Sequence, residues 1–474
     1  MNKANYLLKN MAVLTISNFA SKILVFLLVP LYTSVLNTAE YGSYDLAVST
    51  ATLCYPILTL NIVDAVMRFS MDREYSENKV VSIGFKYVTG GIVIFGIGMI
   101  VFNRFSLWPD VSGLELWMFL YYLFYTLNQF LIQFAKGLEK VMDMAFAGVI
   151  NTVVTIAANV LFLIVFKWGL EGFFIANIAA LSFSVLYLAV RLRIWKYLRL
   201  FYKDRELTRE MFVYCIPLVT STIGWWINSA SDKYVVSFMI GVAANGLLSV
   251  AYKIPTILNT LQSIFIQAWQ ISAIKEYGNN DTAKFYGKTF DIINVMMCAA
   301  CSWLIVLTRP LASFLYANDF FTAWQYVPFL LVSSVFNCAS GLLGPILSAQ
   351  KKSKDMMWSA LIGAGANVIM NIVFAYFIGI QGTTIATVIS SYMIYLVRKR
   401  GVGKNIELSN YIVTLMTWFL ILAQAVIEIY LQSYIFEVVI MVALTVINWA
   451  SLENILKLVK SLLVNAGQKF HHNF

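Results

Sequence analysis

The sequence predicts an all-α polytopic membrane protein with about fourteen transmembrane helices. Three observations predict it: an apolar composition, one-sided placement of basic residues and an internal repeat. Of 474 residues, 60% are hydrophobic and only 12% are charged, unlike soluble domains. A bilayer core about 30 Å thick needs about 20 apolar residues per helix. Such stretches run almost end to end and leave no length for a soluble domain.

Apolar windows and the polar breaks between them give the expected helices. These lie at 11–36, 44–70, 80–102, 114–135, 142–166, 170–192, 211–238, 244–272, 287–308, 322–348, 356–379, 381–397, 410–431 and 433–451. The first run is too long for a signal peptide and lacks a small-residue cleavage site, so we expect a retained span. We expect six-helix lobes at 1–200 and 201–404, and a helix pair with a basic cytoplasmic tail at 405–474.

Lysine and arginine placement sets the orientation, because short cytoplasmic loops are enriched in basic residues. With the N-terminus inside, the inner segments carry 27 basic residues. The outer loops carry 3, namely Arg104, Lys167 and Arg309. Both termini are therefore expected in the cytoplasm. The formal charge of +10 follows from this orientation and requires no nucleic acid partner.

The two halves repeat. Asp143 and Asp355 are 212 positions apart, and in both halves an asparagine, a Gly-x-x-Gly and an Ile-Ala follow. The matching residues are Asn159 and Asn371, Gly169 and Gly379, Gly172 and Gly382, and, earlier in each half, Gly42 and Gly246. Six helices separate equivalent points, so the lobes are parallel repeats around a central cavity, an arrangement suited to alternating access. Paired prolines indicate site-lining helices: Pro30 and Pro56, then Pro217 and Pro255.

Two lysines are expected near the bilayer midplane. Lys22 and Lys253 each lie roughly 14–17 Å along their helices at about 1.5 Å per residue. A charge there costs about 2.5–3.5 kcal/mol unless it meets water, a partner or a ligand. We expect both to face the cavity and bind an anionic head group, the alternative being a structural pair with a carboxylate such as Asp232. Asp232 and Lys233 fall nearer the outer end of their helix.

Other motifs leave two interpretations open. Asp64 and Arg68, four residues apart, predict either a local ion pair or an entry gate. Trp225, Trp226 and Trp269 suit either stacking on sugars or an interfacial aromatic belt. The CxxC at Cys298 and Cys301 is mid-helix, so we expect packing and not redox or metal chemistry.

The chain resembles the polysaccharide-unit flippases of the multidrug, oligosaccharidyl-lipid and polysaccharide exporter superfamily. The resemblance rests on "SNFASKILVFLLVPLYTSVLNTAEYGSYDLA", "SASDKYVVSFMIG" and "GLLSVAYKIPTILNTLQSIFIQAW". It implies a cationic cavity that takes an undecaprenyl-pyrophosphate-linked oligosaccharide from the cytoplasmic leaflet of a bacterial inner membrane, for lipopolysaccharide or capsule synthesis. The family's basic and Asp-basic positions match Lys22, Asp232, Lys233 and Lys253. A proline common after the Trp269 position is missing here.

The resemblance also sets the partners and the alternatives. It implies a lipid-linked substrate, membrane lipid, a coupling ion and polysaccharide assembly proteins as partners, with no cofactor. One alternative is a drug or cation antiporter of the same superfamily, although the deepest charges here are lysines. Another is a membrane polymerase or glycosyltransferase. The only histidines, His471 and His472, lie in the tail, and the GxxxxGK[ST] motif is absent, so we expect no covalent catalysis.

Overall fold

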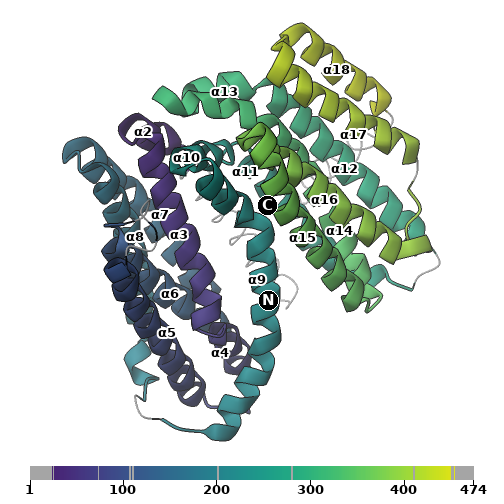
Figure 1. The fold of residues 1–474 in the computed structure, drawn as a ribbon. Coiled ribbons are helices and arrows are strands. Elements are labelled where there is room, and N and C mark those ends of the chain that lie inside the picture. Colours follow the sequence, from purple (N-terminus) through teal and green to yellow (C-terminus); the bar gives the residue numbers. More distant parts are fainter. Residues whose placement is uncertain are drawn as a thin grey trace, which may run out of the picture. The chain divides into compact units, whose positions relative to one another are not determined.

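The computed structural model describes residues 24, 26–72, 74–105, 108, 112–199, 202–278, 281–408, 411–449 and 453. Every regular element among these residues is helical (Figure 1). Contacts group the chain into two units. The first holds Met1–Val250 with Phe314–Phe321, and the second holds Ala251–Ser313 with Thr322–Phe474. The lobe boundaries expected from the repeat stay a prediction.

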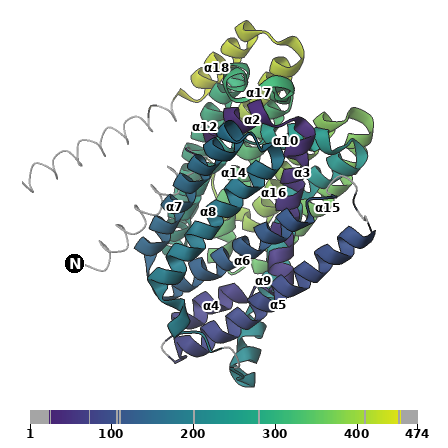
Figure 2. The same ribbon diagram turned by 90° about the vertical axis from the view of Figure 1, so that its left-hand side faces the viewer.

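The first unit is built around α6. Its elements are α2 (Val29–Val35), α3 (Thr38–Leu58), α4 (Ile62–Ser70), α5 (Glu77–Phe105), α6 (Glu115–Gly137), α7 (Val141–Asn159), the π-helical turn η2 (Val160–Val165), α8 (Gly169–Leu192), the 3₁₀ turn η3 (Ile194–Lys196), α9 (Arg205–Met239) and α10 (Val242–Ala251). Helix α6 packs against α3, α4, α5 and α8, while α9 packs against α3 and α4. Figure 2 shows α7 beside α8. Buried aromatic rings fill the core, where Phe95 stacks on Tyr122 with centroids 4.0 Å apart.

The second unit is built around α14. Its elements are α11 (Pro255–Glu276), α12 (Thr282–Val306), α13 (Thr308–Leu315), the 3₁₀ segment η4 (Asn318–Tyr326), α14 (Val327–Ala349), α15 (Ser353–Ile378), α16 (Ile380–Val402), η5 (Gly403–Asn405), α17 (Tyr411–Val426), the π-helical turn η6 (Ile427–Leu431) and α18 (Tyr434–Ile447). Helix α14 packs against α11, α12, α16 and α17. In the span 318–349, 89% of the most apolar window is buried, against 28% for 353–378. Helix α14 is therefore the core of its unit, and α15 has the exposed apolar surface expected of a lipid-facing helix.

Most of the expected spans are present as helices. By length and apolar composition, 8 helices of the described residues can cross a membrane, or up to 10 when each bent pair is counted as one span. The chain is thus a multi-span helical membrane protein. The count of fourteen stays a prediction, since most of the expected span 11–36 lies outside the described residues.

Two of the paired prolines lie next to breaks between helices. Helix α3 contains Pro56 and ends two residues later, and α4 then continues at an angle of 60°. Helix α10 ends at Ala251, and α11 restarts at Pro255 after a three-residue turn. Proline removes one backbone donor and its ring crowds the preceding turn, which explains why helices break there.

The repeat is visible in the two helical hairpins, α7 with α8 and α15 with α16. Gly169 and Gly379 have φ angles of +54° and +62°, a conformation that glycine adopts readily. Three residues later, a Cβ on Gly172 would crowd the carbonyl oxygen of Phe162, and a Cβ on Gly382 would crowd that of Phe374. Phe162 and Phe374 are themselves equivalent in the repeat. The shared glycines therefore allow the same close hairpin in both halves.

Candidate functional site

Helices α3 and α10 cross at Gly42 and Gly246, the equivalent glycines of the two repeats. A Cβ on Gly42 would overlap the carbonyl oxygen of Val242, and a Cβ on Gly246 would overlap that of Thr38. Thr38 precedes Gly42 by the same four residues that separate Val242 from Gly246. The contacts are thus reciprocal, as a local two-fold relation between the repeats requires. Only glycine permits backbones to approach this closely.

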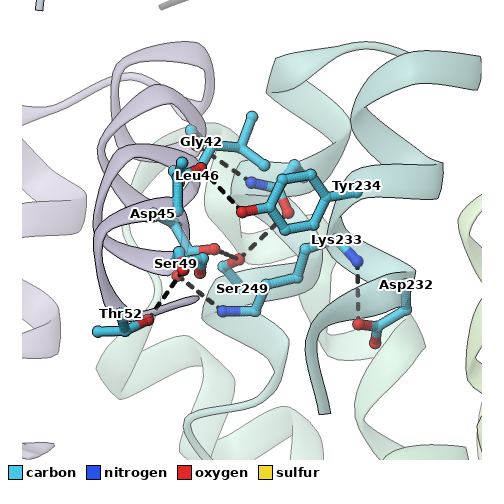
Figure 3. Close-up of polar contacts among 11 residues, drawn as sticks. Gly42, Asp45, Leu46, Ser49, Thr52, Asp232, Lys233, Tyr234 and Ser249 are labelled. Carbon is cyan, nitrogen blue, oxygen red and sulfur yellow. Dashed lines mark hydrogen bonds and ion pairs between the residues drawn. The ribbon is translucent and has the colours of Figure 1, made fainter. Parts of the chain in front are cut away.

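One turn beyond the crossing, a polar cluster joins α3, α9 and α10 (Figure 3). We call Asp45, Lys233, Asn245 and Ser249 the Asp45 cluster. The Lys233 ammonium lies 2.9 Å from Asp45 Oδ1, and the Ser249 hydroxyl donates to Asp45 Oδ2 at 2.8 Å. Asn245 Nδ2 donates to the Gly42 carbonyl at 3.1 Å. Each of α9 and α10 is therefore tied to α3 by at least one side-chain hydrogen bond.

The ion pair in this cluster is largely shielded from solvent. The side chains of Lys233 and Asp45 are 18% and 16% exposed. Charge-assisted hydrogen bonds in such settings are stronger than those at open surfaces, but each ion also loses hydration. The pair therefore links α3 to α9 by a charge-assisted hydrogen bond that is largely shielded from water.

Aromatic and polar side chains line α9 beside the cluster. The Tyr234 hydroxyl lies 2.8 Å from Thr50 Oγ1 of α3. The Trp226 ring meets Tyr234 edge-on at 5.2 Å, and the Trp108 ring lies 6.0 Å from the same ring. Asp232, 4% exposed, accepts a hydrogen bond from the Lys233 backbone N–H at 2.9 Å. Charged and aromatic groups thus lie together on the last turns of α9.

The structure brings together some of the residues predicted for the site. Asp232 and Lys233 are adjacent to the glycine crossing. Lys253 lies in the turn between α10 and α11, partly buried. Arg68 lies at the other end of the bent α3–α4 pair, with its side chain 54% exposed. Lys22 lies outside the described residues.

The expected ion pair of Asp64 and Arg68 does not form. Asp64 instead accepts hydrogen bonds at 2.6 Å from Asn61 Nδ2 and Gln133 Nε2. Arg68 points along the helix to Asp72 at 3.8 Å. The amide of Gln133 comes from α6, so a tertiary contact outcompetes the local i,i+4 pairing.

Trp269 is not available for sugar stacking. Its side chain is 4% exposed, and its Nε1 donates to the Leu342 carbonyl at 2.8 Å. Trp226 keeps an accessible ring edge. Trp269 is therefore excluded as a tryptophan that stacks on a sugar. It packs α11 against α14 instead.

Sequence reasoning missed Asp45. The search for charges at mid-membrane depth did not consider this carboxylate, because it lies only seven residues after Thr38, the start of α3. A signal was nevertheless present, because the repeat that aligns Gly42 with Gly246 also aligns Asp45 with Ser249. Residues next to a self-crossing of equivalent segments are expected to face each other, and these two are hydrogen-bonded.

The comparisons with known proteins agree with this architecture. A profile described as "Polysaccharide biosynthesis protein" matches residues 7–270, more than half of the chain. The chain belongs to this family. A comparison with curated proteins gives no significant match.

Solved structures show the same fold. The chain is similar to "Lipid II flippase MurJ, inward closed conformation", with 15% identity and a TM-score of 0.70, over 93% of this chain and 98% of that one. It is also similar to an inward-facing multidrug resistance MATE family transporter of the MOP superfamily, with 12% identity and a TM-score of 0.67, over 81% and 95%. A MOP superfamily transporter from Pyrococcus furiosus matches with 14% identity and a TM-score of 0.55, over 87% and 93%.

The expected family and the all-helical membrane fold are confirmed by these matches. The solved neighbours are flippases and transporters, not enzymes. The chain is therefore a multi-span membrane protein with the fold of flippases and transporters, in a family of polysaccharide biosynthesis.

Proposed function

We propose that this protein flips a lipid-linked oligosaccharide, carried on undecaprenyl pyrophosphate, across the bacterial cytoplasmic membrane by alternating access. The observation that carries the proposal is the Asp45 cluster at the crossing of the two repeats. There, an exchangeable ion pair ties α3 to α9 at the ends predicted to face outside. This ion pair closes the outer end of the proposed cavity, and its release opens that end.

The chemistry of the cluster suits an anionic cargo. When the Lys233 ammonium leaves Asp45, it becomes a donor for phosphate oxygens, and Lys22 and Lys253 supply two further ammonium groups in the proposed cavity. Ammonium groups are common phosphate ligands in proteins. Asp232 beside Lys233 and exposed Arg68 on α4 complete the proposed binding set, with Arg68 near the cytoplasmic entry.

The membership in a polysaccharide biosynthesis family supports a sugar cargo. One structural match is named a lipid II flippase, which supports a lipid as part of the cargo. The rings of Trp226 and Tyr234 beside Lys233 suit a sugar next to a phosphate, because aromatic faces and sugar C–H groups pack well. We place the cargo's pyrophosphate near the lysines and its first sugars along α9.

The decisive experiment is deletion of the protein followed by analysis of lipid-linked intermediates. Loss of the protein is expected to trap an undecaprenyl-pyrophosphate oligosaccharide on the cytoplasmic leaflet, measured by its inaccessibility to an external sugar-oxidising probe. Lys22→Ala and Lys253→Ala are each expected to reproduce the trapped intermediate while the protein still inserts. The proposal fails if a double Lys22→Ala, Lys253→Ala variant restores export.

A matched control is Arg104→Ala. Arg104 lies exposed near the end of α5, outside the proposed cavity, so its loss removes one basic residue without touching the cargo path. Export by this variant is expected to equal that of the unchanged protein. Immunodetection in isolated membranes verifies equal insertion of all variants.

A drug or cation antiporter is the second candidate, because the chain also shares the fold of a multidrug resistance MATE family transporter. A carboxylate at the centre of the site, Asp45, is the feature that favours it. In that case deletion would raise drug sensitivity without accumulation of a lipid-linked intermediate. The same deletion strain therefore distinguishes the two functions.

A further inference from the structure

In the second unit, two carboxyl groups are buried at the junction of α17 and α18. Glu428 lies in η6, at the end of α17, and Glu437 lies in the first turn of α18. Both residues are 0% exposed. Buried carboxylates are rare unless they are paired, so their partners decide the chemistry of this site.

One guanidinium serves both carboxyl groups. Arg309 of α13 binds Glu428 through two hydrogen bonds, Nε to Oε1 at 3.0 Å and Nη2 to Oε2 at 2.9 Å. The same Nη2 lies 3.5 Å from Glu437 Oε1. The Arg309 side chain is packed over the rings of Tyr434 and Trp324, 4.5 Å and 5.5 Å from their centroids.

The charges of Arg309, Glu428 and Glu437, which we call the Arg309 cluster, do not balance if both carboxyl groups are ionised. One guanidinium against two carboxylates leaves one excess negative charge on carboxyl groups that are themselves fully buried. The hydrogen bonds that Arg309 donates to Glu428 raise the pKa of Arg309 above its ordinary value, so the guanidinium stays positive. An uncompensated buried charge costs several kcal/mol, and protonation of one carboxyl removes it.

The hydrogen bonding of Glu437 identifies which group carries the proton. In the described part of the chain, neither Oε1 nor Oε2 of Glu437 has a hydrogen-bond partner when it is treated as an acceptor. The two carboxyl groups meet at one nitrogen, since Arg309 Nη2 lies 2.9 Å from Glu428 Oε2 and 3.5 Å from Glu437 Oε1. Two ionised carboxylates cannot hydrogen-bond, because both only accept. A proton on Glu437 that is donated to Glu428 satisfies both groups.

The neighbouring elements supply no other compensating charge among the described residues. From α17, the neutral Gln424 donates to the backbone carbonyl of Glu437, and from α12 the nearest polar group is Ser302, which also accepts from Gln424 through its carbonyl. The charged residues of α12, Lys284, Lys288 and Asp291, lie toward its opposite end. From α18 and η4, the facing groups are the rings of Tyr434 and Trp324.

We propose that Glu428 and Glu437 form a proton-binding site, which holds one exchangeable proton between them and is closed by Arg309. Release breaks the O–H bond of Glu437, transfers the proton to water and leaves the cluster with one negative charge. Water reaches the cluster at Arg309, whose side chain is 19% exposed. Proton loss therefore weakens the packing of η6 against α18, because the two carboxylates then repel each other.

The test is infrared difference spectroscopy of the full-length protein in detergent, which detects the C=O stretch of protonated carboxyl groups. At neutral pH, the spectrum of the unchanged protein minus that of Glu437→Gln is expected to show one protonated carboxyl per chain. The amide of the glutamine can donate to Glu428 in place of the hydroxyl, so this variant is expected to fold. Asp143→Asn is the matched control, because Asp143 is an acidic side chain paired with Arg191 at 2.8 Å, without a second carboxyl group in that pair.

A second measurement follows thermal stability across pH. Because the folded protein retains a proton that the unfolded chain releases above about pH 4.3, the unchanged protein loses stability as pH rises until the site itself deprotonates. Glu437→Gln is expected to lack this component. The proposal is overturned if the Glu437→Gln difference spectrum lacks the carboxyl band, or if this variant does not fold although a neutral donor replaces the proton. Both measurements detect the proton on Glu437 and do not measure export, so their outcome does not depend on the proposed cargo.

Discussion

The Lys233–Asp45 pair illustrates how single residues control a moving contact. Asp45 is shared between Lys233 and Ser249, so loss of the lysine leaves the carboxylate with one donor. A partly buried ion that loses its partner costs on the order of 2 kcal/mol. Under the proposed function, the pair favours the closed arrangement until the charged cargo replaces Asp45 as the partner of Lys233.

A charge exchange tests this pair. Lys233→Asp and Asp45→Lys are each expected to abolish export and to lower the free energy of unfolding by about 2 kcal/mol or more. The double exchange restores the attraction, so at least half of the stability is expected to return. Chemical unfolding in detergent measures the free energy of unfolding of each variant.

The control for the charge exchange is Lys86→Asp, since Lys86 of α5 is exposed and lies on a different helix. Additive losses in the double exchange, with no recovery, would show that the two side chains do not interact.

The glycine crossing gives a second residue-level prediction. Gly42→Val and Gly246→Val are each expected to force α3 and α10 apart, because even a Cβ overlaps a backbone oxygen there. The outer end then stays open, and a single cysteine at Ser249 becomes reactive to a membrane-impermeant thiol reagent from outside. Gly98→Val of α5 is the control, since its Cβ would meet nothing within 4 Å. Unchanged labelling in the Gly246→Val variant would argue against a closed crossing.

The residues of the site were only partly predictable from the sequence. Lys233 and Asp232 were found through the family's motif, and the structure places them beside the crossing. Asp45 was missed because its role depends on a helix two hundred residues away, although the repeat register pointed to it. The partner of Arg68 was wrong because i,i+4 spacing offers both Asp64 and Asp72, and only the tertiary contact of Gln133 decides between them.

At the level of elements, the break between α3 and α4 is the most unusual feature of the backbone. Leu60 and Asn61 have φ angles of +50° and +52°, a left-handed conformation that costs a non-glycine residue roughly 1–2 kcal/mol. Asn61 offsets this cost through its hydrogen bond to Asp64. Leu60, 42% exposed, shows no comparable compensation.

Leu60→Gly is therefore expected to leave the free energy of unfolding unchanged or to raise it by up to about 1 kcal/mol. Ile57→Gly is the matched control, because Ile57 is 38% exposed but lies inside α3. That change is expected to lower stability by about 1 kcal/mol. Equal destabilisation by both glycines, measured by thermal unfolding in detergent, would contradict the strain at Leu60.

Helix positions were well predicted because long apolar runs bounded by polar residues have few alternatives in a membrane. The expected helix at 80–102 is α5 (Glu77–Phe105), and the join expected near 380 is Gly379. The π-helical turns η2 and η6 were not foreseen. Each arises at the end of a span, where packing against the next helix shifts the hydrogen-bond register, and no residue pattern signals it.

At the level of the whole molecule, the orientation rests on the distribution of basic residues. Fusions of a fluorescent protein after residue 200 and at the C-terminus are expected to fluoresce, because those sites lie in the cytoplasm. A fusion of alkaline phosphatase after Lys167 is expected to be active, because that site lies outside. Alkaline phosphatase and a fluorescent protein, used as paired reporters, measure both sides. An external C-terminus would contradict the orientation expected from the basic residues.

The repeat was the strongest global prediction, since its hairpins and its crossing both recur with matching glycines. The grouping of α9 and α10 with the first unit was not foreseen. It arises from tertiary contacts of α9 with α3 and α4, which no local pattern encodes.

A duplicated chain is usually free to let its two copies diverge. Here Gly42 and Gly246 each rest on the backbone of the other copy, so a larger residue in either one disturbs both at once. A substitution of either glycine alone therefore disrupts the contact for both copies. This pair of positions is expected to change slowest when homologous sequences are compared over long evolutionary distances.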